Sequence, residues 1–215
     1  MPQDAVPQLS PLETPIAVRP DYIAELPTTI VIQQREYTSL GRDYVVRNKE
    51  TGSLLLSVKA SSVSKSQRRT FEDVSGSPLF DLRRHYWSKA KHWYLYRPGE
   101  SDDSLMTANI RWSMLLGLTL TVRNMAAEGS GVDIDVRELG WHGVNTTIRM
   151  GSKDVATMSR TAADGTSSEG VLERMSPKKR PIWTIHVAQG FDLSLAAVIG
   201  VMCAEHYPEY HFVVA

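Results

Sequence analysis

The chain alternates apolar and polar positions over many short segments that are separated by turn-forming residues. Within residues 116–124, Leu118, Leu120 and Val122 share one parity, while threonines and an arginine occupy the other. A period of two is the pattern of a β-strand with one buried and one solvent-facing side. Residues 132–139 repeat it, with apolar side chains opposite acidic and basic ones. Both segments are therefore expected to be amphipathic strands.

About eleven or twelve strands are expected in total, at close spacing along the chain. Gly52 and the Pro98-Gly99 pair lie between neighbouring segments, where tight turns need such residues. Many short strands joined by turns are typical of antiparallel sandwiches and barrels. The expected strands are 28–37, 44–48, 53–60, 70–76, 79–86, 92–97, 105–114, 116–124, 132–139, 144–151, 155–161 and 182–188.

Near the C-terminus the pattern changes to an uninterrupted apolar run. Residues 193–204 carry no charge and lie between Asp192 and Glu205. As a helix this run rises about 18 Å, against roughly 30 Å of membrane hydrocarbon, so it is too short to span a bilayer. A helix that is apolar on all sides is buried in protein, and the interior of a large closed barrel offers such a place. Asp192 is the expected N-cap, and Pro208 is expected to end the helix.

The chain starts with a segment of different composition. Six of the eleven prolines fall within residues 1–27, which we therefore predict to be an extended, flexible tail. Residues 28–215 are expected to form the barrel domain. Residues 162–181 are polar and rich in glycine and serine, which predicts a mobile surface loop. The first residues lack the basic and apolar regions of a signal peptide, which indicates an intracellular protein.

Composition narrows the function classes. The 24 basic residues balance the 24 acidic ones, so bulk charge gives no reason to expect specific nucleic-acid binding. Cys203 is the single cysteine, so no internal disulfide framework is expected. We expect a cytoplasmic protein without a transmembrane segment. A peripheral position at a membrane and shuttling to the nucleus, through the basic residues 178–180, are left open.

No arrangement of catalytic residues stands out. The sequence Gly129-Ser130-Gly131 lacks the strand-to-helix setting of a nucleophile elbow. The histidines are scattered without the spacing of a zinc site, and Asp133 and Asp135 belong to the polar face of a predicted strand. We therefore expect no enzyme activity, no cofactor and no metal.

Four segments together resemble the LURP-one-related family, whose fold is that of the tubby C-terminal domain and the phospholipid scramblases. They are RDYVVRNKETGSLLLSVKA (42–60), FEDVSGSPLFDLRRHYWS (71–88), HWYLYRPGE (92–100) and VAQGFDLSLAAVIGVMCAEHY (187–207). The resemblance implies a closed, roughly twelve-stranded antiparallel barrel around a hydrophobic C-terminal helix. It also suggests recognition of anionic lipid head groups, as in tubby-like domains.

Basic residues cluster near the ends of three predicted strands, among aromatic residues. This rim could bind phosphorylated head groups such as those of phosphoinositides, or could simply be a solvated charged edge. In 92–97, Trp93 and Leu95 share one face and Tyr94 and Tyr96 the other, and one of these faces belongs to the core. The candidate ligand-binding residues are Arg68, Arg69, Arg83, Arg84, Lys89 and Lys91.

The main hypothesis is therefore a non-enzymatic module that binds an anionic membrane lipid. The alternative is a protein-interaction or regulatory scaffold that acts through residues 1–27 and 162–181, with no role in lipid binding. The sequence leaves the oligomeric state open.

Overall fold

The computed structural model describes most of the chain. The described residues are 9–35, 43–61, 68–85, 92–111, 117–139, 145–161 and 182–211. Residues 162–181, which were predicted to be a mobile loop, lie outside these ranges.

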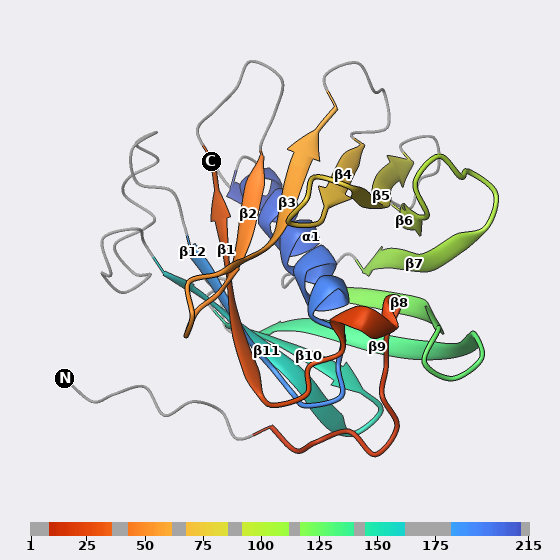
Figure 1. Cartoon of the computed structure of the whole chain (residues 1–215), viewed down its shortest axis with the longest axis vertical. Helices are drawn as coiled ribbons and strands as arrows, with labels where there is room; N and C mark the ends of the chain where they lie inside the picture. The colour runs from red at the N-terminus through yellow and green to blue at the C-terminus, as the bar shows by residue number, and fades with distance from the viewer. Residues whose placement is uncertain are drawn as a thin grey trace.

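Twelve antiparallel strands form a closed barrel around one long helix (Figure 1). Strands that follow one another in sequence pair with one another, and β1 closes the barrel against β12. The prediction of a roughly twelve-stranded barrel that encloses a C-terminal helix is confirmed. The elements are β1 (Thr28–Gln34), β2 (Tyr44–Asn48), β3 (Leu54–Ala60), β4 (Arg69–Glu72), β5 (Pro78–His85), β6 (His92–Tyr96), β7 (Ser104–Arg111), β8 (Gly117–Asn124), β9 (Ser130–Leu139), β10 (Asn145–Met150), β11 (Lys153–Thr161), β12 (Ile182–Val187) and α1 (Leu193–His211).

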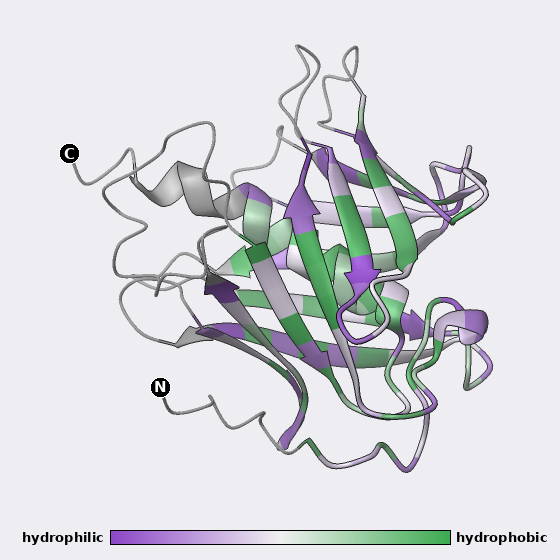
Figure 2. Cartoon of the chain, turned by 60° about the vertical axis from the view of Figure 1, so that its left-hand side comes forward, coloured by the Kyte–Doolittle hydropathy of each residue, from purple (hydrophilic) through white to green (hydrophobic). Residues whose placement is uncertain are grey.

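The alternation of the sequence determines which way each strand faces. Leu118 pairs with Val136 and Leu120 pairs with Ile134 across β8 and β9, and all four side chains are buried inside the barrel. Thr121, which lies between Leu120 and Val122 in β8, is exposed on the outer face. Figure 2 shows this alternation as bands of hydrophobic and hydrophilic residues along the strands.

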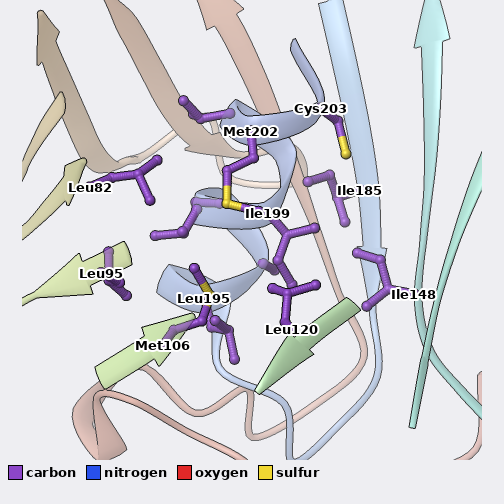
Figure 3. Close-up of a cluster of buried hydrophobic side chains, with 14 of the residues drawn as sticks. Leu82, Leu95, Met106, Leu120, Ile148, Ile185, Leu195, Ile199, Met202 and Cys203 are labelled. Carbon is purple, nitrogen blue, oxygen red and sulfur yellow. The ribbon is translucent and has the colours of Figure 1, made fainter. Parts of the chain in front are cut away.

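Helix α1 fills the interior of the barrel. Its residues 194–204 are all buried, because strands surround the helix on every side. In Figure 3, Leu195, Ile199, Met202 and Cys203 of the helix lie among side chains of the strands. These strand residues are Leu82, Leu95, Met106, Leu120, Ile148 and Ile185. The charge-free run therefore provides the centre of the hydrophobic core.

Helix α1 lies nearest to β1 and β12, and a glycine permits this approach. A Cβ atom placed on Gly200 would lie 2.4 Å from Cδ1 of Ile32 and 2.7 Å from Cδ1 of Ile185. Carbon atoms do not approach one another so closely without repulsion. The absence of a side chain at residue 200 therefore sets the distance between the helix and this side of the barrel.

The C-terminal end of α1 differs from the expectation. The helix continues to His211 and includes Pro208, so the prediction that Pro208 ends it is wrong. Proline lacks one backbone donor, but its fixed φ is compatible with a helix. Near a helix end only a small part of the hydrogen-bond ladder is affected.

Residues 12–24, which we name the N-terminal strap, cross the end of the barrel at which α1 begins (Figure 1). The N–H of Ile16 donates to the carbonyl of Gly190 at 2.9 Å, and the N–H of Asp192 donates to the carbonyl of Ile16 at 3.0 Å. Further along the strap, the N–H of Gly190 donates to the carbonyl of Ala24 at 2.8 Å. The chain that enters α1 is thus held between two passes of the strap.

These contacts correct the prediction of a flexible tail over residues 1–27. Prolines do keep the strap out of regular sheets, as expected, but they do not keep it away from the core. Four apolar side chains of the strap are buried: Ile16, Ala17, Val18 and Ala24. The strap is part of the folded domain, while residues 1–8 lie outside the described part of the chain.

Candidate functional site

The arginines that were predicted to form one basic rim are divided between two sides of the barrel wall. Arg83 and Arg84 are consecutive in β5, so they point to opposite faces. The side chain of Arg83 is 19% exposed on the outer face, whereas Arg84 is 1% exposed and lies inside. Lys89 and Lys91 lie outside the described residues.

On the outer face, Arg68 and Arg83 share one carboxylate. Arg68 donates from Nε and Nη2 to the two oxygens of Asp81, at 2.8 and 2.7 Å. Arg83 donates from Nη2 to Oδ2 of Asp81 at 3.3 Å, and Thr70 donates its hydroxyl to Oδ1 at 3.0 Å. We name these four residues the Asp81 cluster.

Asp81 is negatively charged over a wide pH range. Burial acts to raise the pKa of its carboxyl, but hydrogen bonds from Arg68 and Thr70 and the charge of Arg68 together lower it below the usual value. The described groups of the Asp81 cluster thus combine two positive charges with one negative charge. The result is a net positive site in which a buried anion fixes the positions of two guanidinium groups.

Aromatic rings line the next strand on the same outer face. The rings of Tyr94 and Tyr96 in β6 are stacked, with centroids 6.1 Å apart and planes 17° apart. The guanidinium carbon of Arg83 lies 5.0 Å from the centroid of Tyr96. The opposite face of β6 carries Trp93 and Leu95, which are fully buried and form the core face that the sequence left undecided.

Two arginines, Arg69 and Arg84, lie inside the barrel, and Arg69 contacts helix α1. Arg69 forms an ion pair with Glu205 of the helix, with Nη2 3.1 Å from Oε2. Tyr44 donates its hydroxyl to Oε1 of the same glutamate at 2.9 Å. The guanidinium carbon of Arg84 lies 5.5 Å from the centroid of the Trp93 ring. Arg69 and Tyr44 thus hold Glu205 of the helix, and both inner arginines are buried.

Two charged residues of the barrel wall, Asp81 and Arg160, were not predicted from the sequence. Asp81 lies between basic residues and two positions before Arg83, a spacing that places both on one face of a strand. That signal was available. Arg160 of β11 is also inside the barrel, with its guanidinium carbon 5.6 Å from the centroid of Trp183. Its inward direction follows from the alternation of Met158 and Arg160, both of which are buried.

Two further properties concern the described part of the chain. None of its helices has the length and apolar character that are needed to cross a membrane. Within the same residues, histidine, cysteine and acidic side chains do not gather in groups of three that could hold a metal ion.

Comparison with known proteins agrees with this architecture. An X-ray structure of a protein from Arabidopsis thaliana aligns with a TM-score of 0.58 at 22% identity, over 88% of this chain and 97% of that one. Protein LURP-one-related 15 of Arabidopsis thaliana is 27% identical over 103 residues, which are 48% of this chain and 47% of that protein. The chain therefore spans about half the length of the curated relative that it matches. The family model described as LURP-one-related matches residues 28–204, most of the chain, and the protein belongs to the LURP-one-related family.

Proposed function

We propose that this protein is a non-enzymatic binding module that recognises an anionic, phosphoinositide-type lipid head group. The proposed site consists of Arg68 and Arg83 on the outer barrel face, together with Lys89 and Lys91 of the connection between β5 and β6. The observation that carries the proposal is the sharing of Asp81 by Arg68 and Arg83.

Preorganisation makes this arrangement suitable for a phosphate. Long arginine side chains lose rotamer freedom when they bind, and Asp81 already restricts Arg68 through two short hydrogen bonds. Each guanidinium has five N–H donors, so contact with Asp81 leaves donors for a second anion. Because a phosphomonoester carries close to two negative charges at neutral pH, it is attracted by the net positive cluster.

Tyr94 adds a partly exposed aromatic ring beside the charges, stacked on the buried ring of Tyr96. Tyr94 is partly exposed, and the Tyr94–Tyr96 stack borders Arg83. Tyrosine combines an apolar ring with a polar hydroxyl, which suits the boundary between lipid head groups and water. We infer that this side of the barrel faces the membrane when the protein is bound.

Liposome sedimentation tests the proposal. The protein is incubated at moderate salt with phosphatidylcholine vesicles, with or without a minor fraction of phosphatidylinositol 4,5-bisphosphate. Vesicles with phosphatidylserine at equal total charge separate head-group recognition from general attraction. We expect sedimentation with the phosphoinositide vesicles and clearly less with the other two. Equal recovery in the supernatant for all three would refute the proposal.

A double variant, Arg68→Gln with Arg83→Gln, tests the assigned residues. Removing two phosphate contacts should lower the partition coefficient by at least about tenfold, because hydrogen bonds to charged groups contribute about 1.5–3 kcal/mol each. The matched control is Arg123→Gln with Arg137→Gln, which removes two other partly exposed arginines that also pair with aspartates. A control variant that loses as much binding as the test variant would argue against this site.

A further inference from the structure

A pocket lies where the N-terminal strap meets the barrel, and its lining does not include the Asp81 cluster. Its volume is about 220 Å³. The buried residues Val18, Leu79, Phe80 and Leu105 line it and make its walls mainly apolar. The pocket is therefore formed jointly by the strap and by strands β5 and β7.

The mouth of the pocket is marked by exposed residues and by two arginines. Pro20, Pro98 and Met125 are exposed lining residues, and Arg19 and Arg97 also line the pocket. An apolar cavity with a positively charged edge fits a compact ligand that has an apolar body and one anionic group.

Arg19 and Arg97 form ion pairs of different length with their carboxylate partners. Arg19 forms a bidentate ion pair with Asp21, in which Nε and Nη2 donate to the two carboxylate oxygens at 2.9 and 2.8 Å. Arg97 contacts Glu100 at 3.3 Å and Asp103 at 3.7 Å, in both cases through Nη1. Charge-assisted hydrogen bonds are usually about 2.7–2.9 Å long, so these contacts of Arg97 are weak. Arg97 is therefore better able to bind an incoming carboxylate.

Asp103 also forms a shorter ion pair with Arg123 than with Arg97. Its two oxygens accept hydrogen bonds from Nη1 and Nη2 of Arg123, at 2.7 and 2.5 Å. When a ligand displaces Arg97 from Asp103, this aspartate keeps its main partner. The exchange then costs only the weak contacts of Arg97, which is a further reason to assign the anionic group to Arg97.

The volume limits the size of the apolar body. A protein cavity of about 150 Å³ accommodates benzene, so a pocket of this size holds one aromatic ring with a short substituent. We propose that this pocket binds a small carboxylate that bears a single aromatic ring, with the ring between the strap and the barrel and the carboxylate on Arg97. A ligand with so few atoms is expected to bind with a dissociation constant of about 1 mM.

Nuclear magnetic resonance with sodium phenylacetate as the probe tests this proposal on the full chain. Backbone amide shifts of Val18, Arg19 and Leu105 should move and saturate during the titration. Acetate lacks the ring and phenylacetamide lacks the charge, so each should produce much smaller shifts at equal concentration. Unchanged shifts of these amides with phenylacetate, or equal shifts with acetate, would overturn the proposal.

Variants then locate the carboxylate. Arg97→Gln should weaken phenylacetate binding by about tenfold or more, because it removes the charged donor. Arg149→Gln is the matched control, since Arg149 has the same 40% side-chain exposure and also pairs with a partly exposed carboxylate. Binding that is unchanged in Arg97→Gln would contradict the assignment.

A second variant places an opposing charge at the mouth. Met125→Glu puts a carboxylate at an exposed lining position and should prevent phenylacetate binding by repulsion. Amide spectra without ligand show whether each variant is folded. A folded Met125→Glu protein that binds phenylacetate as the wild type does would overturn the proposal as well.

Discussion

The carboxylate of Asp192 accepts a hydrogen bond from the backbone N–H of Val18, at 3.0 Å, although 174 positions separate the two residues. The same side chain accepts from the N–H groups of Ser194 and Leu195 through Oδ1, as an N-cap does. One buried carboxylate therefore starts helix α1 and anchors the N-terminal strap. The strap and the helix are expected to unfold together.

Replacement of Ile16 by serine tests whether the strap belongs to the cooperative fold. Ile16 is 2% exposed and packs in the core cluster. The variant loses a buried apolar side chain and leaves a hydroxyl in its place, so the free energy of unfolding should fall by about 2–5 kcal/mol. Urea denaturation followed by circular dichroism measures the change.

Leu26→Ser provides the control, because Leu26 follows the strap and is 69% exposed. Its denaturation midpoint should remain within experimental error of the wild type. If Ile16→Ser also leaves the midpoint unchanged, the strap does not contribute to the global stability.

The barrel could be predicted because the polarity pattern of each strand depends only on neighbouring positions in the sequence. Each strand has one face in the core and one in solvent, so positions such as Leu120 and Thr121 must alternate in polarity. Helix α1 is enclosed on all sides, so its residues 194–204 are nearly all apolar. Neither feature depends on knowing which distant residues are in contact.

The strap could not be predicted in the same way. Its backbone pairs with residues 189–192, and nothing in the sequence near Ile16 indicates that partner. The prolines before and after the apolar run of residues 16–18 suggested an extended chain, which is correct for its conformation. The error was to infer flexibility from irregularity, because an irregular segment can still be fixed by distant hydrogen bonds.

The candidate site could be predicted from the sequence only in part. The opposite directions of Arg83 and Arg84 follow from strand geometry, because Phe80 and Leu82 are fully buried core positions of β5 and Arg84 shares their parity. A parity argument therefore could have placed Arg84 inside. The partner of Arg69 could not be found in this way, since Glu205 lies 136 positions away.

Replacement of Val198 by aspartate tests the enclosure of helix α1. Val198 is fully buried at the centre of the core, so the variant places an unpaired charge there. The cost exceeds several kcal/mol, comparable to the whole stability of a typical domain, and we expect the protein to be unfolded. Val201→Asp should behave in the same way, and circular dichroism melts measure both.

The control for these variants is Val74→Asp, which makes the same chemical change at a position that is 67% exposed. It should melt cooperatively near the wild-type temperature. A melt of Val198→Asp that resembles this control would show that the helix is accessible to solvent.

Gly200→Ala tests the close approach of the helix to β1 and β12. An added methyl group collides with the ends of two isoleucine side chains, Ile32 and Ile185. Alanine has the higher helix propensity by about 1 kcal/mol, but overpacking of a core costs about 1–3 kcal/mol. We therefore expect a net loss of up to about 2 kcal/mol by urea denaturation.

A companion experiment shortens the two isoleucine side chains that the added methyl group meets. Gly200→Ala combined with Ile32→Val and Ile185→Val removes both terminal methyl groups that the alanine meets. The triple variant should be more stable than the sum of the separate changes predicts, because the residues are coupled. Strict additivity would show that the spacing at Gly200 is not limiting.

Asp81→Asn tests the role of the shared carboxylate through its pH dependence. The folded-state pKa of Asp81 is lowered, so its contribution to the free energy of unfolding is present above the unfolded pKa of about 3.9 and is lost as the pH falls through the folded value. At neutral pH the variant should lose about 1–3 kcal/mol, less than for a fully buried pair because Arg68 is 39% exposed.

The difference between wild type and Asp81→Asn should therefore shrink as the pH falls below about 4, because the carboxyl of the unfolded chain then takes up a proton while the folded one is still charged. It should be smallest once the pH is below the folded-state pKa as well. Urea denaturation across pH 2.5–7 would measure it, with Asp133→Asn as the control for an exposed aspartate on the outer face. A difference that stays constant across this range would mean that Asp81 stabilises the barrel by its shape and not by its charge. In that case the positions of Arg68 and Arg83 would not depend on the charge of Asp81, and Asp81→Asn should bind phosphoinositide vesicles at least as well as the wild type, because the variant also removes a negative charge from the site.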